Sequence, residues 1–238
     1  MVPTRTLTTP DGVMDVYVAE PAQPRGSGVI VIQEAFGVNH HIQSIADRLA
    51  AEGYVALAPA LFHRSGSPIL DYGDIPAAMQ HLGVLTAAGL SVDLDATIAA
   101  FADYGITARQ IGLIGFCMGG SVSFFAATRC PIGASVGFYR GGIAASRMGI
   151  PSLLELAPSV TVPWLGQYGD EDQGIPVEQV EQLREALASV GADTQIIRYP
   201  GAGHGFNCDE RPAAYHRASA VAAWARALEW FDRHLARS

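Results

Sequence analysis

The chain has 238 residues, 49% hydrophobic and 16% charged, which is enough apolar mass to bury a large core and argues against a disordered protein. Its formal net charge of -8 disfavours nucleic acid and membrane surfaces as partners, because both are anionic. The chain contains no lysine, so a Lys Schiff base, a pyridoxal phosphate anchor and a phosphate-loop Lys are excluded.

The hydrophobic pattern predicts strands that alternate with helices along nearly the whole chain. In chain order we expect a strand at 14–20, a strand at 28–33, a helix at 39–52, a strand at 54–58, helices at 75–88 and 92–104, a strand at 110–116, a helix at 118–128, strands at 132–139 and 162–168, a helix from Pro176 to Gly191, a strand at 194–199 and a helix from Pro212 to about Leu235. Apolar strands in this alternation are typical of a mostly parallel central sheet with helices on both faces. We therefore predict one α/β domain over residues 1–238.

The cysteines and the apolar stretches of the chain indicate the cellular compartment of the protein. Cys117, Cys130 and Cys208 are an odd and sparse set without the spacing of a zinc finger, which is typical of free thiols in a reducing environment. Residues 1–12 lack the apolar segment of a secretory signal, and no apolar run is long enough to span a bilayer. We expect a cytoplasmic protein.

Residue Cys117 stands in a Gly-x-Cys-x-Gly turn between a predicted strand and a predicted helix. This order is that of the nucleophile elbow of α/β-hydrolases, with Cys in place of Ser. Gly115 and Gly119 would leave room for a turn too tight for side chains, and the helix N-terminus would favour thiolate. The alternative is a buried structural cysteine in a glycine-rich turn. The strand before it and the helix after it favour the catalytic interpretation.

After the cysteine, the chain supplies an acid and then a histidine, which is the order that such hydrolases require. His204 lies in a glycine-rich loop after a predicted strand and before the last helix, whereas the other histidines lie on helix surfaces or away from the expected site. Asp172 is expected to orient the imidazole, with Asp170 in the same loop as the alternative. Spare carboxylates in that loop would be solvated turn residues.

Glu34 closes a buried strand, where a carboxylate needs a partner. The structural alternative is a helix cap or a salt bridge. The functional interpretation places Glu34 beside Cys117, where it would accept the thiol proton. The backbone N–H groups of Met118 and Ala35 are then the predicted oxyanion donors.

With these residues placed, the chain resembles the dienelactone hydrolase family over nearly its whole length. The resemblance rests on these motifs: Gln-Glu-Ala-Phe-Gly-Val-Asn at 33–39, Gly-Phe-Cys-Met-Gly-Gly at 115–120, Gly169 through Asp172 with Pro176, Gly-His-Gly-Phe at 203–206, Arg211-Pro212, Tyr215 and Ala-Ala-Trp at 222–224. It implies an α/β-hydrolase fold, a Cys117–His204–Asp172 triad and a thioester acyl-enzyme. It also implies that Glu34 hydrogen-bonds the resting thiol and helps to activate it.

The chain departs from the family at two arginines that bind the carboxylate of the lactone in lactone-specific members. No arginine occurs between Arg64 and Arg109, and Cys208 stands near the expected second position. Arg140 is the predicted substitute anion contact, with a plain surface arginine as the alternative. Further predicted substrate contacts are Phe36, Tyr139 and Phe206.

We therefore expect a hydrolase of small esters or lactones that needs neither a metal nor an organic cofactor. The alternatives are a thioesterase or other acyl hydrolase, and a catalytically silent binding or redox-sensing domain. The expected partner is a small-molecule substrate, and the expected state is a monomer or a weak homo-oligomer. Glycines between residues 63 and 89 would permit a mobile cap, which the sequence leaves open.

Overall fold

The computed structural model describes residues 4–236. Eight strands form one sheet in the order β1-β2-β4-β3-β5-β6-β7-β8. The strands are β1 Thr4–Thr9, β2 Gly12–Ala19, β3 Gly28–Ile32, β4 Val55–Pro59, β5 Ile111–Phe116, β6 Ala134–Phe138, β7 Trp164–Gly169 and β8 Thr194–Tyr199. β2 pairs antiparallel with β1 and β4, and the other neighbouring strands pair in parallel.

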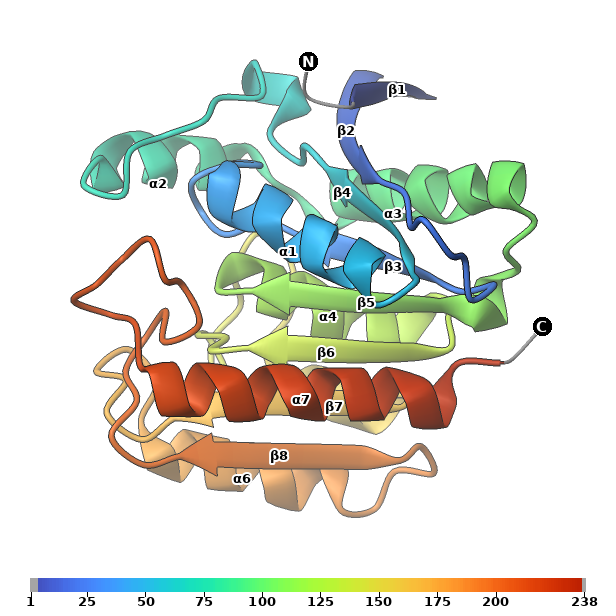
Figure 1. Cartoon of the computed structure of the whole chain (residues 1–238). Coiled ribbons are helices and arrows are strands. Elements are labelled where there is room, and N and C mark those ends of the chain that lie inside the picture. Colours follow the sequence, from blue (N-terminus) through green and yellow to red (C-terminus); the bar gives the residue numbers. More distant parts are fainter. Residues whose placement is uncertain (1–3, 237–238) are drawn as a thin grey trace.

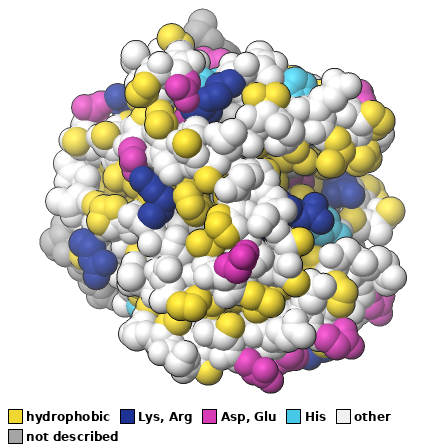
Figure 2. Space-filling view, turned by 180° about the vertical axis from the view of Figure 1, so that it is seen from behind, with side chains coloured by type: hydrophobic (Ala, Val, Ile, Leu, Met, Phe, Trp, Pro, Cys, Tyr) yellow, Lys and Arg dark blue, Asp and Glu magenta, His cyan; other side chains and the backbone are white. Residues whose placement is uncertain are grey.

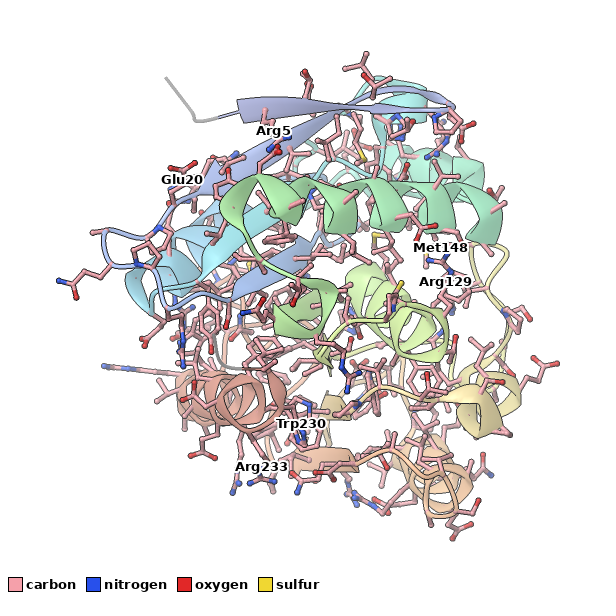
Figure 3. All side chains as sticks on the ribbon, turned by 90° about the vertical axis from the view of Figure 1, so that its right-hand side faces the viewer. Arg5, Glu20, Arg129, Met148, Trp230 and Arg233 are labelled. Carbon is pink, nitrogen blue, oxygen red and sulfur yellow. The ribbon has the colours of Figure 1, made fainter. Side chains whose placement is uncertain are left out.

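Helices cover both faces of this sheet, as predicted. They are α1 His40–Ala51, α2 Ile75–Val84, α3 Ala87–Ala100, α4 Met118–Arg129, α5 Leu153–Leu156, α6 Val177–Leu187 and α7 Arg217–His234. Figure 1 shows α1 and α7 in front of the sheet, with α4 and α6 behind it. In Figure 3, Trp230 and Arg233 of α7 lie on the opposite side of the sheet from Arg129 at the end of α4. β3 to β7 are buried at every position, which explains why they read as unbroken apolar runs.

The structure corrects three details of the predicted elements. The strand β1 over residues 4–9 was not predicted, because its threonine-rich sequence lacks the apolar run that marks a buried strand. Such a polar sequence suits an edge strand that water reaches. The helices predicted at 75–88 and 92–104 divide earlier than expected. The first ends at Val84 and the second begins at Ala87, where the Thr86 side chain accepts the backbone N–H of Gly89. The last helix begins at Arg217 instead of Pro212, because the preceding residues form successive turns.

The described residues contain no single helix that is long and apolar enough to cross a membrane. Helices Ile75–Val84 and Ala87–Tyr104 meet that test only as a pair, and they are bent by 84° at the break between them.

The carboxyl ends of the parallel strands lie at one edge of the sheet. The arrowheads of β5, β6 and β8 point to the left in Figure 1, where α2 and the loop before α7 also lie. In such sheets ligands bind outside these strand ends. The segments after β3, β5, β7 and β8 therefore meet at this edge, and they carry Glu34, Cys117, Asp172 and His204.

Candidate active site

Cys117 occupies a strained turn between β5 and α4. Its backbone has φ 53° and ψ -114°, and residues other than glycine rarely adopt such a positive φ. A Cβ on Gly115 would lie 2.0 Å from the carbonyl oxygen of Gly119, and a Cβ on Gly119 would lie 2.5 Å from that of Ile32. Backbone atoms cannot yield at these distances, so both glycines are required by the turn. The geometry is that of a nucleophile elbow.

His204 and Asp172 form a direct contact at the neighbouring strand ends. His204 Nδ1 lies 2.7 Å from Asp172 Oδ2. The other carboxylate oxygen, Oδ1, accepts the backbone N–H of Gly174 at 2.9 Å, which fixes the plane of the carboxyl group. Asp170, the alternative acid, instead accepts Arg198 Nε at 2.7 Å. The structure therefore brings Asp172 to the imidazole and leaves Asp170 in a separate ion pair.

The surroundings of His204 favour its protonated form. Burial by itself would lower the pKa of the imidazole, but hydrogen bonds to Asp172 and Cys117 outweigh burial and raise this pKa to about 10. An imidazolium next to a sulfur stabilises the thiolate form of a cysteine. His204 thus contacts Asp172 directly and shares the wall of one cavity with Cys117.

Glu34 lies at the same site and is almost completely buried, with 1% of its surface exposed. Neither of its carboxylate oxygens has a hydrogen-bond partner among residues 4–236. The hydrogen bond expected between this carboxylate and the Cys117 thiol is therefore not formed in this structure. Both groups nevertheless line one cavity.

The two predicted oxyanion donors also line the cavity. Met118 is the first residue of α4, and Ala35 follows the end of β3. In the part of the chain that the structure describes, neither backbone N–H donates to a backbone carbonyl. Met118 N–H is free because a helix N-terminus leaves its first donors unpaired, and Ala35 N–H is free in the turn that follows β3.

The cavity has a volume of about 500 Å³ and mixes apolar walls with a few charged groups. Its apolar lining includes these side chains: Phe36, Ile75, Ala78, Met79, Leu82, Met148 and Ile175. Four of them belong to α2, so this helix forms one wall of the site. In Figure 2 the right-hand side of the molecule is hollowed, with arginine and histidine side chains beside apolar surface.

The other expected substrate contacts differ in outcome. Phe36 lines the cavity, whereas Tyr139 and Phe206 are completely buried and are not among the lining residues. The Tyr139 ring packs at 5.2 Å from the His204 ring and at 5.3 Å from Phe206. Tyr139 therefore packs against the imidazole, and Phe206 packs against Tyr139.

Arg140 is completely buried, so the alternative of a surface arginine is wrong. Its Nε donates to Ser121 Oγ at 2.8 Å, and burial lowers the pKa of the guanidinium to about 9. Arg140 is absent from the cavity wall, so it does not offer the predicted anion contact in this structure.

Two arginines that sequence reasoning missed do line the cavity, namely Arg147 and Arg211. Neither forms a salt bridge with the described part of the chain. Arg211 follows His204 by seven residues, and its guanidinium lies 5.9 Å from the centre of the Phe36 ring. The Arg211-Pro212 pair in the family-like tail was the available signal for this residue, whereas Arg147 lies in a loop without a motif.

Comparison with known proteins agrees with the fold and with the motifs. A model of the dienelactone hydrolase family matches residues 14–235. A "Putative carboxymethylenebutenolidase" from Yersinia pestis is 38% identical over 234 residues, which cover 96% of this chain and 87% of that protein. A protein with the same name from Escherichia coli (strain K12) is 39% identical, with coverage of 93% and 83%. The crystal structure of a "Putative Dienelactone Hydrolase" from Klebsiella pneumoniae superimposes with a TM-score of 0.89 at 35% identity and covers 98% of both chains. The chain therefore belongs to the dienelactone hydrolase family and is a hydrolase of ester or lactone bonds with the α/β-hydrolase fold.

Proposed function

We propose that the chain hydrolyses small carboxylic esters or lactones through a thioester acyl-enzyme on Cys117. The observation that carries this proposal is the 2.7 Å contact between Asp172 and His204, made beside Cys117 at the wall of the cavity. The carboxymethylenebutenolidase name of the relatives points to the same class of bond, a lactone ester.

In the first half of the reaction, the thiolate of Cys117 attacks the carbonyl carbon of the ester. The carbonyl oxygen becomes an oxyanion, which the N–H groups of Met118 and Ala35 stabilise. The tetrahedral intermediate then collapses, the carbon–oxygen bond to the alcohol breaks, and the imidazolium of His204 gives its proton to the departing alkoxide. The acyl group is left on sulfur as a thioester.

In the second half, neutral His204 takes a proton from water while the water oxygen attacks the thioester carbon. The carbon–sulfur bond breaks, the carboxylic acid leaves, and the Cys117 thiolate is restored beside the imidazolium. Asp172 holds Nδ1 throughout, so that the other ring nitrogen faces the reacting atoms. When Cys117 is in its neutral thiol form, Glu34 offers a second acceptor for the thiol proton, because its carboxylate lies at the same cavity without a partner.

The cavity favours a small acyl group that carries a negative charge. A volume of about 500 Å³ suits a compact molecule, and the apolar wall from α2 suits its hydrocarbon part. Arg147 and Arg211 supply two positive charges that no described carboxylate neutralises through a salt bridge. We propose that they take over the role predicted for Arg140 and bind a carboxylate of the substrate.

The chemistry also suits a reducing compartment such as the cytoplasm. All three cysteines are free, and the nucleophile is partly exposed, so an oxidising environment would inactivate it.

The proposal is tested with p-nitrophenyl esters, enol lactones and acyl thioesters as substrates. Wild type should turn over several of them, Cys117→Ala should retain no measurable rate, and Cys130→Ala should serve as the matched control, because Cys130 is buried at the end of α4. Rapid acid quenching followed by mass spectrometry should find the acyl group on the peptide that contains Cys117.

Equal rates for wild type and Cys117→Ala would exclude the nucleophile. Turnover without acylation of that peptide would exclude the thioester intermediate. A protein that binds the substrates without turnover would be a silent binding domain, and preference for thioesters would make it a thioesterase.

A further inference from the structure

Glu34, His41 and Cys208 form a second cluster of reactive side chains next to the active site. They come from three segments: the end of β3, the first turn of α1 and the loop between β8 and α7. One ligand atom of each residue lies within 4.8 Å of those of the other two. Glu34 and His41 are each 1% exposed, and Cys208 is 0% exposed. We refer to this set as the Glu34–His41–Cys208 cluster.

The polar atoms of this cluster are largely unpaired. Both carboxylate oxygens of Glu34 and both ring nitrogens of His41 lack a hydrogen-bond partner in the described chain. Cys208 Sγ has a polar contact with the hydroxyl of Tyr72 at 3.3 Å. Burial of a carboxylate without a partner is strongly unfavourable, and buried charges are normally paired or bound to a metal. A metal cation is the kind of partner that would satisfy these groups.

The three side chains are of the types that bind zinc. Thiolate, imidazole and carboxylate are its usual protein ligands, and three protein ligands with one open position are typical of accessible zinc sites. Ligand bonds of about 2.0–2.3 Å require the ligand atoms of a tetrahedral site to lie about 3.3–3.8 Å apart. The cluster would therefore contract by about 1 Å around the ion, a shift within reach of side-chain rotation.

Two neighbouring features support a metal site. His41 Nδ1 lies 3.7 Å from Asp209 Oδ1, and an outer carboxylate near a ring nitrogen commonly orients a ligating histidine. Glu34 also lines the catalytic cavity, so one ligand of the cluster is reached from that cavity. We propose that the Glu34–His41–Cys208 cluster binds a divalent transition-metal ion of the zinc class.

Such an ion would regulate the enzyme without taking part in its reaction. Because the proposed function uses the Glu34 carboxylate as an acceptor for the Cys117 thiol proton, a metal bound to this carboxylate withdraws it from the thiol. Zinc is then a reversible inhibitor that a chelator removes. This consequence rests on the proposed function, whereas binding itself can be measured without any substrate.

Binding is tested by titrating the full-length wild-type protein with Co²⁺, which reports a thiolate ligand through an intense ligand-to-metal charge-transfer band, and by calorimetry with Zn²⁺. We expect one ion per chain. Cys208→Ser should lose the charge-transfer band, and His41→Gln should weaken Zn²⁺ binding by more than about tenfold. Circular dichroism and thermal unfolding show whether each variant is folded.

Two control variants distinguish this site from the catalytic cysteine and from an arbitrary thiol. Cys117→Ala and Cys130→Ser should both keep the band. Persistence of the band in Cys208→Ser, its loss in Cys117→Ala, or the absence of stoichiometric binding by wild type would each overturn the proposal. Loss of Zn²⁺ inhibition of ester hydrolysis in Cys208→Ser would support the regulatory role. If wild type bound the ion and Cys208→Ser lost the band, but Zn²⁺ did not inhibit wild type, the metal site would be supported. Regulation through Glu34 would then be refuted.

Discussion

The exchange Asp172→Asn removes an acceptor from the 2.7 Å contact with His204 Nδ1 and puts either an amide oxygen or an amide N–H in its place. The amide oxygen can keep the bond from the backbone N–H of Gly174, now 2.9 Å long, so the loop is expected to hold its shape. With its oxygen engaged there, the amide N–H₂ faces the ring and selects the wrong tautomer of the imidazole. The variant should therefore fold normally and react slowly.

The expected loss follows from the role of the carboxylate in holding and stabilising the imidazolium. Loss of the corresponding carboxylate in a hydrolase triad lowers kcat by about 10³–10⁴, or ~4–5.5 kcal/mol of barrier. The pKa of His204 should also fall, because burial, which lowers it, is then opposed only by Cys117. The assay is steady-state hydrolysis of a p-nitrophenyl ester over a range of pH, with thermal unfolding as the folding control.

Asp170→Asn is the matched control, since Asp170 stands two residues away and pairs with the partly exposed Arg198. A surface ion pair contributes about 0–1 kcal/mol to stability, so this variant should keep its activity within a few-fold of wild type. If Asp172→Asn hydrolysed the ester within tenfold of wild type, or if both variants lost activity equally, the assignment of the triad acid would be refuted.

Three further predictions concern the elbow, the imidazole and the cavity. Gly119→Ala should lower the free energy of unfolding by about 3 kcal/mol, because its Cβ would lie 2.5 Å from a backbone oxygen of β3. Measured by urea unfolding, the stability of the control Gly191→Ala should equal that of wild type, since a Cβ there meets nothing within 4 Å. Because the folded-state pKa of His204 is raised from 6.5 to about 10, its stabilising contribution is full below pH 6.5 and is lost as pH rises through about 10. The stability difference between wild type and His204→Gln should therefore shrink over that range, and growth with pH would contradict the assignment. Arg147→Gln and Arg211→Gln should each raise KM about tenfold for esters with a free carboxylate and leave neutral esters unaffected, and equal changes for both classes would exclude the anion site.

Local sequence patterns determined most of the fold and predicted the order of the proposed catalytic residues. Buried strands read as apolar runs because helices cover both faces of the sheet, and this requirement is visible at each strand separately. The elbow was predictable because its glycines and Cys117 lie within five residues of one another. The steric conflict at Gly115 is local, with the carbonyl oxygen of Gly119, whereas the conflict at Gly119 is with Ile32 of the distant strand β3. His204 followed from its place in the chain order. Where local patterns were weak, at the polar edge strand β1 and in the turns before α7, the predicted boundaries were wrong.

The tertiary structure alone decided which of several equivalent side chains meet. The sequence favoured Asp172 over Asp170 but left both open, and the path of the loop after β7 turns Asp170 toward Arg198 and Asp172 toward His204. In the same way, Arg140 is buried beneath the site while Arg147 reaches the cavity. The approach of His41 and Cys208 to Glu34 also became visible only in the folded chain. Contacts of this kind join segments that are far apart in sequence, and their geometry depends on how strands and helices pack, which no local pattern of residues encodes.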